Sequence, residues 1–103
     1  MSGPAKYALK YLPAAQEDII SILDYIAQDS PSCALAFVDK LDDHIGRLEQ
    51  HPLLGRVPGH PKLREFGYRV LNVESYLAFY IIRGNQIEAH RVVHGSRNLD
   101  CLI

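Results

Sequence analysis

The sequence predicts an α+β fold in which a helical hairpin packs on a small antiparallel sheet, in the order β-α-α-β-β-β. Three observations support this prediction. Apolar residues recur every three or four positions between residues 13 and 48, and residues 51–61 are rich in proline and glycine. Residues 66–94 then alternate as β-strands do. The chain has 103 residues, which is enough for one core, so we expect a single domain over residues 1–103.

The N-terminal half is expected to contain one short strand and two amphipathic helices. Residues 7–11 favour a strand, which Pro13 ends. A helix over residues 13–29 follows, and Ser30 and Pro31 are typical of the N-cap and first position of a second one. The apolar stripes are Ile19, Ile22, Leu23 and Ile26 in the first helix, and Ala34, Phe37, Val38, Leu41, Ile45 and Leu48 in the second.

The C-terminal half is expected to form a loop followed by a three-stranded meander. Prolines and glycines are too dense in residues 51–61 for a helix or a central strand. Residues 66–73, 76–83 and 86–94 are rich in Val, Ile, Tyr and Phe, and each gap between them is only two residues long. Gaps this short predict antiparallel neighbours.

Composition excludes several classes of protein. Hydrophobic residues make up 48% and charged residues 22% of the chain, which is a globular composition. No apolar run approaches the roughly 20 residues that span a bilayer, and the N-terminus lacks the layout of a signal peptide. We therefore expect a cytoplasmic protein without membrane contact. Cys33 and Cys101 have no metal-site spacing, and no glycine-rich phosphate loop is present, so neither metal nor cofactor is expected.

The charges are distributed unevenly along the chain. Residues 1–50 carry eight acids and four bases, whereas residues 51–103 carry four acids and seven bases, six of them arginines. Because the planar arginine fork binds carboxylates and phosphates, the second half is where an anionic partner would bind. Ordinary surface charge is the alternative interpretation.

The meander suggests a candidate anion-binding site. If both hairpin loops have an even number of residues, Arg69 lies opposite Tyr80, and Tyr80 lies opposite Ala89. Arg69, Tyr80 and Arg91 would then share one face of the sheet with Tyr76. The arginines would hold phosphates, and a tyrosine would stack on a base or donate its hydroxyl.

Other polar residues lie near this candidate site. His94 and Arg97 follow the last strand and would reach the rim of the site. The alternative interpretation is that the arginine stems cover an apolar sheet and pair with acids such as Glu65 or Glu88. His90 alternates with apolar residues and is expected to be a packing residue.

The order of elements and four short segments together resemble a known family. These segments are HPLLGR, GYRVL, the FY of the second meander strand and RVVHGSR. With them, nearly the whole chain resembles the RelE/ParE superfamily of type II toxin-antitoxin toxins, most closely its ParE branch. The resemblance implies a small cytoplasmic toxin that a cognate antitoxin neutralises. DNA would be contacted only indirectly, through the antitoxin.

Within that superfamily the resemblance implies two classes of target. ParE-like members poison DNA gyrase, whereas RelE-like members are ribosome-dependent endoribonucleases that cut messenger RNA. Arg69 and Arg91 match positions that are arginine in nuclease members, and His94 falls near their C-terminal histidine or tyrosine, so these three residues would be catalytic in a nuclease. The lysine cluster of RelE-like nucleases is absent, and the net charge of -1 gives little attraction to ribosomal RNA. We therefore favour the ParE-like function, with Arg69, Tyr80, Arg91 and Arg97 contacting the target.

Overall fold

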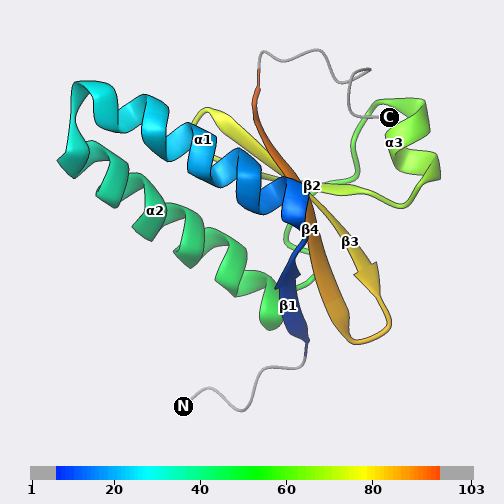
Figure 1. The fold of residues 1–103 in the computed structure, drawn as a ribbon. Coiled ribbons are helices and arrows are strands. Elements are labelled where there is room, and N and C mark those ends of the chain that lie inside the picture. The colour runs from blue at the N-terminus through cyan, green and yellow to red at the C-terminus, as the bar shows by residue number, and fades with distance from the viewer. Residues whose placement is uncertain (1–6, 96–103) are drawn as a thin grey trace.

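The computed structural model describes residues 7–95 of the chain. Helices and strands follow the predicted order (Figure 1). They are β1 (Ala8–Tyr11), α1 (Pro13–Asp29), α2 (Pro31–Gly46), the 3-10 helix η1 (Arg47–Glu49), α3 (Pro61–Glu65), β2 (Arg69–Val73), β3 (Tyr76–Arg83) and β4 (Gln86–His94). η1 continues the second predicted helix through Leu48, whereas α3 was not predicted. It begins at Pro61, whose fixed φ suits the first turn of a helix, and it buries Leu63.

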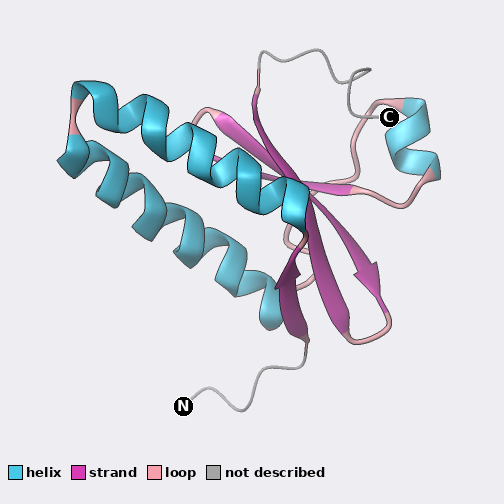
Figure 2. Cartoon of the chain, viewed as in Figure 1, coloured by secondary structure: helices cyan, strands magenta, loops and turns pink. Residues whose placement is uncertain are grey.

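The junction between α1 and α2 forms as its sequence predicts. Ser30 has extended backbone geometry, and its side-chain oxygen accepts a hydrogen bond from the backbone N–H of Cys33 at 3.3 Å. Pro31 occupies the first turn of α2, where its missing N–H removes no helical hydrogen bond. The chain therefore reverses sharply, and the two helices run side by side as a hairpin (Figure 2).

The four strands form one mixed sheet in the order β1-β4-β3-β2. The meander is antiparallel as predicted, but β1 pairs with β4 in parallel, so the expectation of a wholly antiparallel sheet is wrong in this detail. The two-residue turns determine the directions within the meander only. No tight turn connects β1 to β4, so β1 can pair with β4 in parallel.

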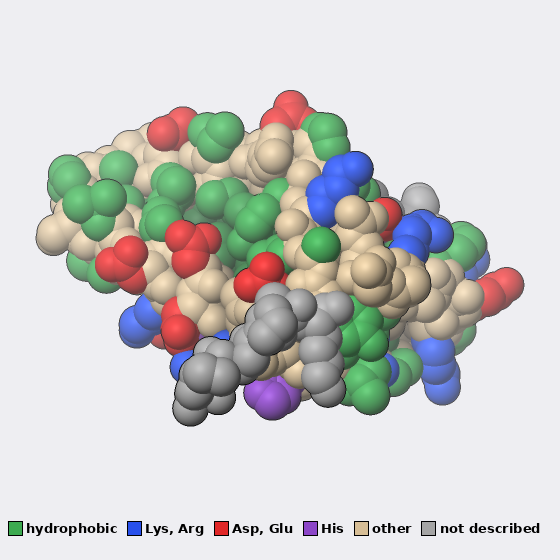
Figure 3. Space-filling model, turned by 90° about the horizontal axis from the view of Figure 1, so that it is seen from below, with side chains coloured by type: hydrophobic (Ala, Val, Ile, Leu, Met, Phe, Trp, Pro, Cys, Tyr) green, Lys and Arg blue, Asp and Glu red, His purple; other side chains and the backbone are tan. Residues whose placement is uncertain are grey.

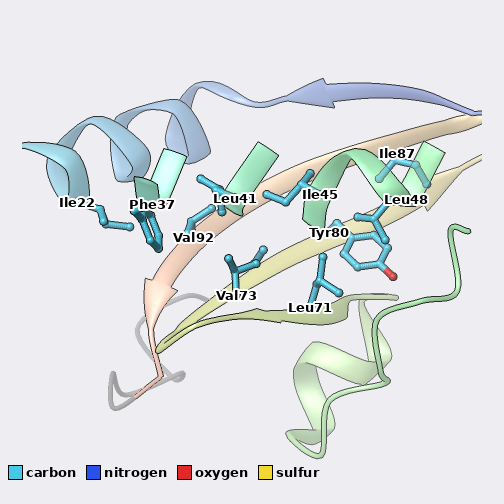
Figure 4. Close-up of a cluster of buried hydrophobic side chains, with 11 residues drawn as sticks. Ile22, Phe37, Leu41, Ile45, Leu48, Leu71, Val73, Tyr80, Ile87 and Val92 are labelled. Carbon is cyan, nitrogen blue, oxygen red and sulfur yellow. The ribbon is translucent and has the colours of Figure 1, made fainter. Parts of the chain in front are cut away.

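The helical hairpin covers one face of the sheet and encloses the larger of two apolar clusters (Figure 4). Its buried members are Ile22, Phe37, Leu41, Ile45, Leu48, Leu71, Val73, Ala78, Tyr80, Ile87 and Val92. The helical members come from the predicted stripes, and the ring of Phe37 packs on Tyr76 with centroids 5.1 Å apart. Burying these side chains is the main contribution to stability.

The opposite face of the sheet carries a smaller cluster beneath α3. Leu63 of α3 packs there with Val70, Phe79 and Val93, and Tyr68 lies edge-on to Phe79. In the view of Figure 3, acidic side chains are more frequent over the hairpin, and Lys and Arg are more frequent toward α3. No helix between residues 7 and 95 is both long enough and apolar enough to cross a bilayer.

Candidate functional site

The register of the meander determines which of the predicted site residues lie together. Arg69 lies opposite Tyr80, and Tyr80 lies opposite Ala89, so both predicted pairings are confirmed. Residues that face each other across a ladder project from the same side of the sheet. Arg69 and Tyr80 therefore share the face that the helical hairpin covers, as the place of Tyr80 in the larger cluster shows.

A β-bulge in β4 interrupts that face. Tyr80 pairs with Ala89, but the preceding residue, Phe79, pairs with Arg91. His90 is therefore an extra residue in β4, which the even loop lengths do not reveal. Beyond it, the side chains of β4 exchange faces.

The bulge separates the two arginines that were expected to converge. Val92 packs in the larger cluster under the helices and Val93 packs in the smaller one, which is the reverse of what regular alternation from Ala89 would give. The register likewise places Arg91 with the residues of the α3 side, whereas Arg69 projects toward the hairpin side. The prediction that Arg69 and Arg91 share one face is wrong, because one extra residue reverses the alternation.

Arg91 is bound by an aspartate of α1. Its Nε lies 2.7 Å from Asp18 Oδ2 and its Nη2 lies 3.0 Å from Asp18 Oδ1, a bidentate ion pair. Asp18 Oδ2 also accepts the backbone N–H of Val92 at 2.9 Å. The hydrogen bonds that Arg91 donates to Asp18 raise the pKa of its guanidinium above the ordinary value. The charge of Arg91 is thus used to attach α1 to β4.

Arg69 binds the backbone of residues 51–60, which we call the 51–60 loop. Its Nε and Nη2 donate to the carbonyl of Gly55 at 3.1 and 2.7 Å, and Nη2 also donates to the carbonyl of Leu53 at 3.3 Å. Glu88, one of the acids considered as its partner, instead accepts from Arg83 at 2.7 Å. The guanidinium of Arg69 therefore holds a loop in place.

Tyr80 binds the same loop from the apolar core. Its ring is 1% exposed, and its hydroxyl donates to the carbonyl of Pro52 at 2.7 Å and accepts the N–H of Gly55 at 2.9 Å. A Cβ at position 55 would lie 2.6 Å from the Tyr80 oxygen, which only glycine avoids. The two residues predicted to contact a target from this face, Arg69 and Tyr80, thus anchor the 51–60 loop.

The remaining predicted residues lie at the end of β4. His94 is exposed, lies opposite Tyr76, and its ring packs edge-on against the Tyr76 ring at 5.3 Å. It also lines an open groove of about 870 Å³ between the hairpin and the sheet, together with Tyr25 and Phe37. Arg97 lies outside the described residues.

One polar network was missed by the sequence analysis. His90 Nε2 lies 3.2 Å from Glu88 Oε1, and His90 Nδ1 lies 3.1 Å from the hydroxyl of Tyr68. Because a carboxylate only accepts hydrogen bonds, Nε2 carries a proton, and in the neutral imidazole Nδ1 accepts from Tyr68. The expectation that His90 is only a packing residue is therefore wrong. The spacing of Glu88 and His90 on one strand was the available signal, whereas Tyr68 comes from another strand.

The environment of this network determines its protonation. Burial raises the pKa of the Tyr68 hydroxyl, which keeps it neutral and able to donate. The hydrogen bond from Arg83, followed by that from His90, lowers the pKa of Glu88. The network is therefore a neutral phenol, an imidazole and an ionised carboxylate in series. Among residues 7–95, no three His, Cys, Asp or Glu side chains form a metal-binding group.

Two solved structures share this architecture. The chromosomal ParDE toxin-antitoxin system from P. aeruginosa has a chain that is 26% identical, with a TM-score of 0.71 over 86% of this chain and 96% of that one. The toxin-antitoxin complex RelBE2 from Mycobacterium tuberculosis has a chain with 19% identity and a TM-score of 0.57, over 91% of this chain and 97% of that one. The second likeness shows the fold alone.

Sequence comparison identifies the family. No curated protein sequence matches the chain. A family model does match, over residues 9–99, and its description is the ParE toxin of the type II toxin-antitoxin system parDE. The match spans β1 to β4 and includes Arg69, Tyr80, Arg91 and His94. The chain therefore belongs to the ParE toxin family of type II toxin-antitoxin systems.

Proposed function

We propose that this toxin arrests growth by binding and poisoning DNA gyrase in the cytoplasm, and that a cognate antitoxin neutralises it. In this proposal the chain is a binding protein and not a nuclease. Its own contact with DNA is indirect, through the antitoxin. Membership of the ParE family supports the choice of target class.

The separation of Arg69 from Arg91 is the observation that carries the proposal. Cleavage of a phosphodiester requires cationic groups that converge on the reacting phosphate and stabilise its developing charge. Arg69 donates to loop carbonyls on the hairpin side, and Arg91 is paired with Asp18 at the edge of β4. Both guanidinium groups are thus held by other groups of the protein, and the ring of His94 packs against Tyr76, so the geometry supports surface binding over catalysis.

The ribosome-dependent ribonuclease is the second candidate, and one observation favours it. Tyr68, His90 and Glu88 form a hydrogen-bonded series of the kind that moves protons in general acid-base catalysis. Arg83 donates a hydrogen bond to Glu88 and so adds a cation to this series, and its side chain is 61% exposed. A nuclease built here would use His90 in place of the predicted His94.

Two assays on the purified chain separate the candidates. In the first, relaxed plasmid, ATP and DNA gyrase are incubated with the toxin. We expect inhibited supercoiling and accumulation of cleaved DNA. In the second, a translation extract with a reporter messenger RNA is scored for cuts in the ribosomal A site, and we expect none.

Variants make this comparison sharper. His94→Ala and His90→Ala remove the histidines that a nuclease requires, and we expect both to retain inhibition of gyrase. The proposal is overturned in favour of the ribonuclease if the wild type cuts messenger RNA without affecting gyrase and either variant no longer cuts it.

A further inference from the structure

The 51–60 loop and the residues around α3 carry several exposed large hydrophobic side chains. Seven large hydrophobic side chains between residues 7 and 95 are exposed, and four of them lie between residues 53 and 66. They are Leu53 at 67%, Leu54 at 50%, Val57 at 50% and Phe66 at 57%. Leu53 and Leu54 are consecutive and line the same hollow, and exposed apolar side chains that lie together are typical of an interaction surface.

The loop that carries three of these side chains is held firmly. Tyr80 and Arg69 bind its backbone at Pro52, Leu53 and Gly55. Arg56 then exchanges two backbone hydrogen bonds with Val70 on the edge strand β2, at 2.8 and 2.9 Å. These contacts fix the backbone while the side chains of Leu53 and Leu54 remain in solvent. A surface ordered before binding loses less conformational entropy when a partner binds.

Leu54 lines two hollows in the surface. One, of about 360 Å³, is also lined by Leu53 and Pro52. The other, of about 330 Å³, is lined by the cationic side chains of Arg47 and Arg56 together with His44. Within the described part of the chain, no carboxylate lines either hollow. Arg47 is already paired with Asp43 at 2.7 Å, whereas Arg56 donates to the neutral side-chain amide of Asn72 at 3.2 Å. An apolar ridge therefore borders a hollow whose positive charge comes mainly from Arg56.

We propose that the 51–60 loop is the surface with which this toxin docks on its protein target, a folded partner that offers an apolar pocket bordered by carboxylates. This inference rests on the proposed function, since it specifies how the poisoned enzyme is recognised. The ridge of Leu53 and Leu54 enters the pocket, and a carboxylate at its border faces Arg56. A rigid ridge suits a preformed pocket, whereas a flexible peptide that folds on binding requires a groove.

The proposal gives Arg69 and Tyr80 a different role from the one predicted. Both lie beneath the loop and present it, so they are positioning residues. The contact residues are Leu53, Leu54 and Arg56. Substituting a positioning residue should weaken binding by loosening the loop, and this effect is separable from a loss of folding.

The test compares the double variant Leu53→Asp, Leu54→Asp with the control Leu35→Asp. Leu35 is 70% exposed on α2, so all three substitutions place a charge on solvent-exposed positions, and unfolding curves check that each variant folds. We expect the double variant to need about tenfold or more toxin for half-inhibition of gyrase supercoiling, as for loss of an interface hot spot, and the control to match the wild type. Equal inhibition by the double variant and wild type overturns the inference.

Growth arrest in a bacterial host distinguishes failure of this inference from failure of the proposed target. If the wild type arrests growth without inhibiting gyrase, the proposed target is wrong. The role of the loop is then tested by comparing the growth arrest that the double variant and the wild type cause. Arrest by the double variant at the wild-type level overturns the inference in that case as well. A wild-type chain that neither arrests growth nor inhibits gyrase overturns both.

Tyr80→Phe tests the positioning role. We expect faster amide hydrogen exchange at Leu54 and Gly55, unchanged exchange in the centres of β3 and β4, and weaker inhibition per folded molecule. A purely structural role for the hydroxyl would leave inhibition per folded molecule at the wild-type value, which would contradict the positioning role.

Discussion

Asp18 of α1 binds Arg91 of β4 across 73 positions of sequence, with two hydrogen bonds of 2.7 and 3.0 Å between carboxylate and guanidinium. The same carboxylate accepts the N–H of Val92 at 2.9 Å, just beyond the bulge. Asp18 thus accepts the backbone hydrogen bond of Val92 and pairs with the side chain of Arg91. Arg91, one of the two arginines predicted to bind an external anion, instead joins the helical hairpin to the sheet.

Arg91→Ala should therefore reduce stability. The ion pair is 30% and 15% exposed at its two side chains, so we expect the free energy of unfolding to fall by about 1–3 kcal/mol. Asp18→Ala should lower the free energy of unfolding further, because it also leaves the N–H of Val92 without its acceptor. Urea denaturation of both single variants and the double variant measures the coupling between the two residues.

Lys40→Ala is the matched control for this ion pair. Lys40 lies 3.1 Å from Glu74, but both side chains are about half exposed, so its loss should cost no more than about 1 kcal/mol. If Arg91→Ala is as stable as the wild type yet no longer toxic, Arg91 is a contact residue after all.

Gly55→Ala should destabilise the protein through the 51–60 loop. The added Cβ would lie 2.6 Å from the Tyr80 hydroxyl and 2.8 Å from the carbonyl of Val70, so one of them must move. We expect a loss of about 1–3 kcal/mol in the free energy of unfolding, as for an overpacked site. Gly59→Ala in the same loop meets nothing within 4 Å and should change stability by less than about 0.5 kcal/mol. Equal stabilities of the two variants would contradict the close contact.

The fold could be predicted from the sequence because local signals agree with one another. The apolar stripes of the helices, the cap at Ser30 and the two-residue turns each act over a few residues. They specify the hairpin and the meander, and the bounds of β3 and β4 match the predicted ranges. The direction of β1 has no such local signal, and the parallel pairing with β4 was accordingly missed.

The candidate site was harder to predict because it depends on one inserted residue. His90 bulges from β4, and no glycine or proline in that strand marks the position. Alternation therefore placed Arg91 on the wrong face. The roles of Arg69 and Tyr80 depend on where a proline-rich loop crosses the sheet, and periodicity carries no information about that path.

Glu88 should make stability depend on pH in the acid range. Its pKa lies below the ordinary value of 4.5, first because Arg83 donates a hydrogen bond to it and then because His90 does. A lowered pKa means that the folded state holds the carboxylate ionised more strongly than the unfolded state does. The resulting stability is fully present above pH 4.5 and is lost as the pH falls through the lower, folded-state value.

The variant Glu88→Gln removes this contribution. We therefore expect the urea midpoint of the wild type to fall more than that of the variant between about pH 6 and about pH 2.5. NMR titration of Arg83→Ala should also show the pKa of Glu88 moving upward. A pKa that stays in place would assign the shift to His90 instead.

Glu74→Asn should leave the protein as stable or slightly more stable. Glu74 occupies the turn between β2 and β3 with a φ of 57°, a left-handed conformation that costs an ordinary residue about 1–2 kcal/mol and that asparagine tolerates better. The substitution also removes the pair with Lys40, but an exposed pair contributes only about 0.2–1 kcal/mol. Relief of backbone strain should offset that loss, giving a gain of up to about 0.5 kcal/mol in the free energy of unfolding. Lys40→Ala measures the pair alone, so a loss in Glu74→Asn larger than in Lys40→Ala would mean that the turn is not strained.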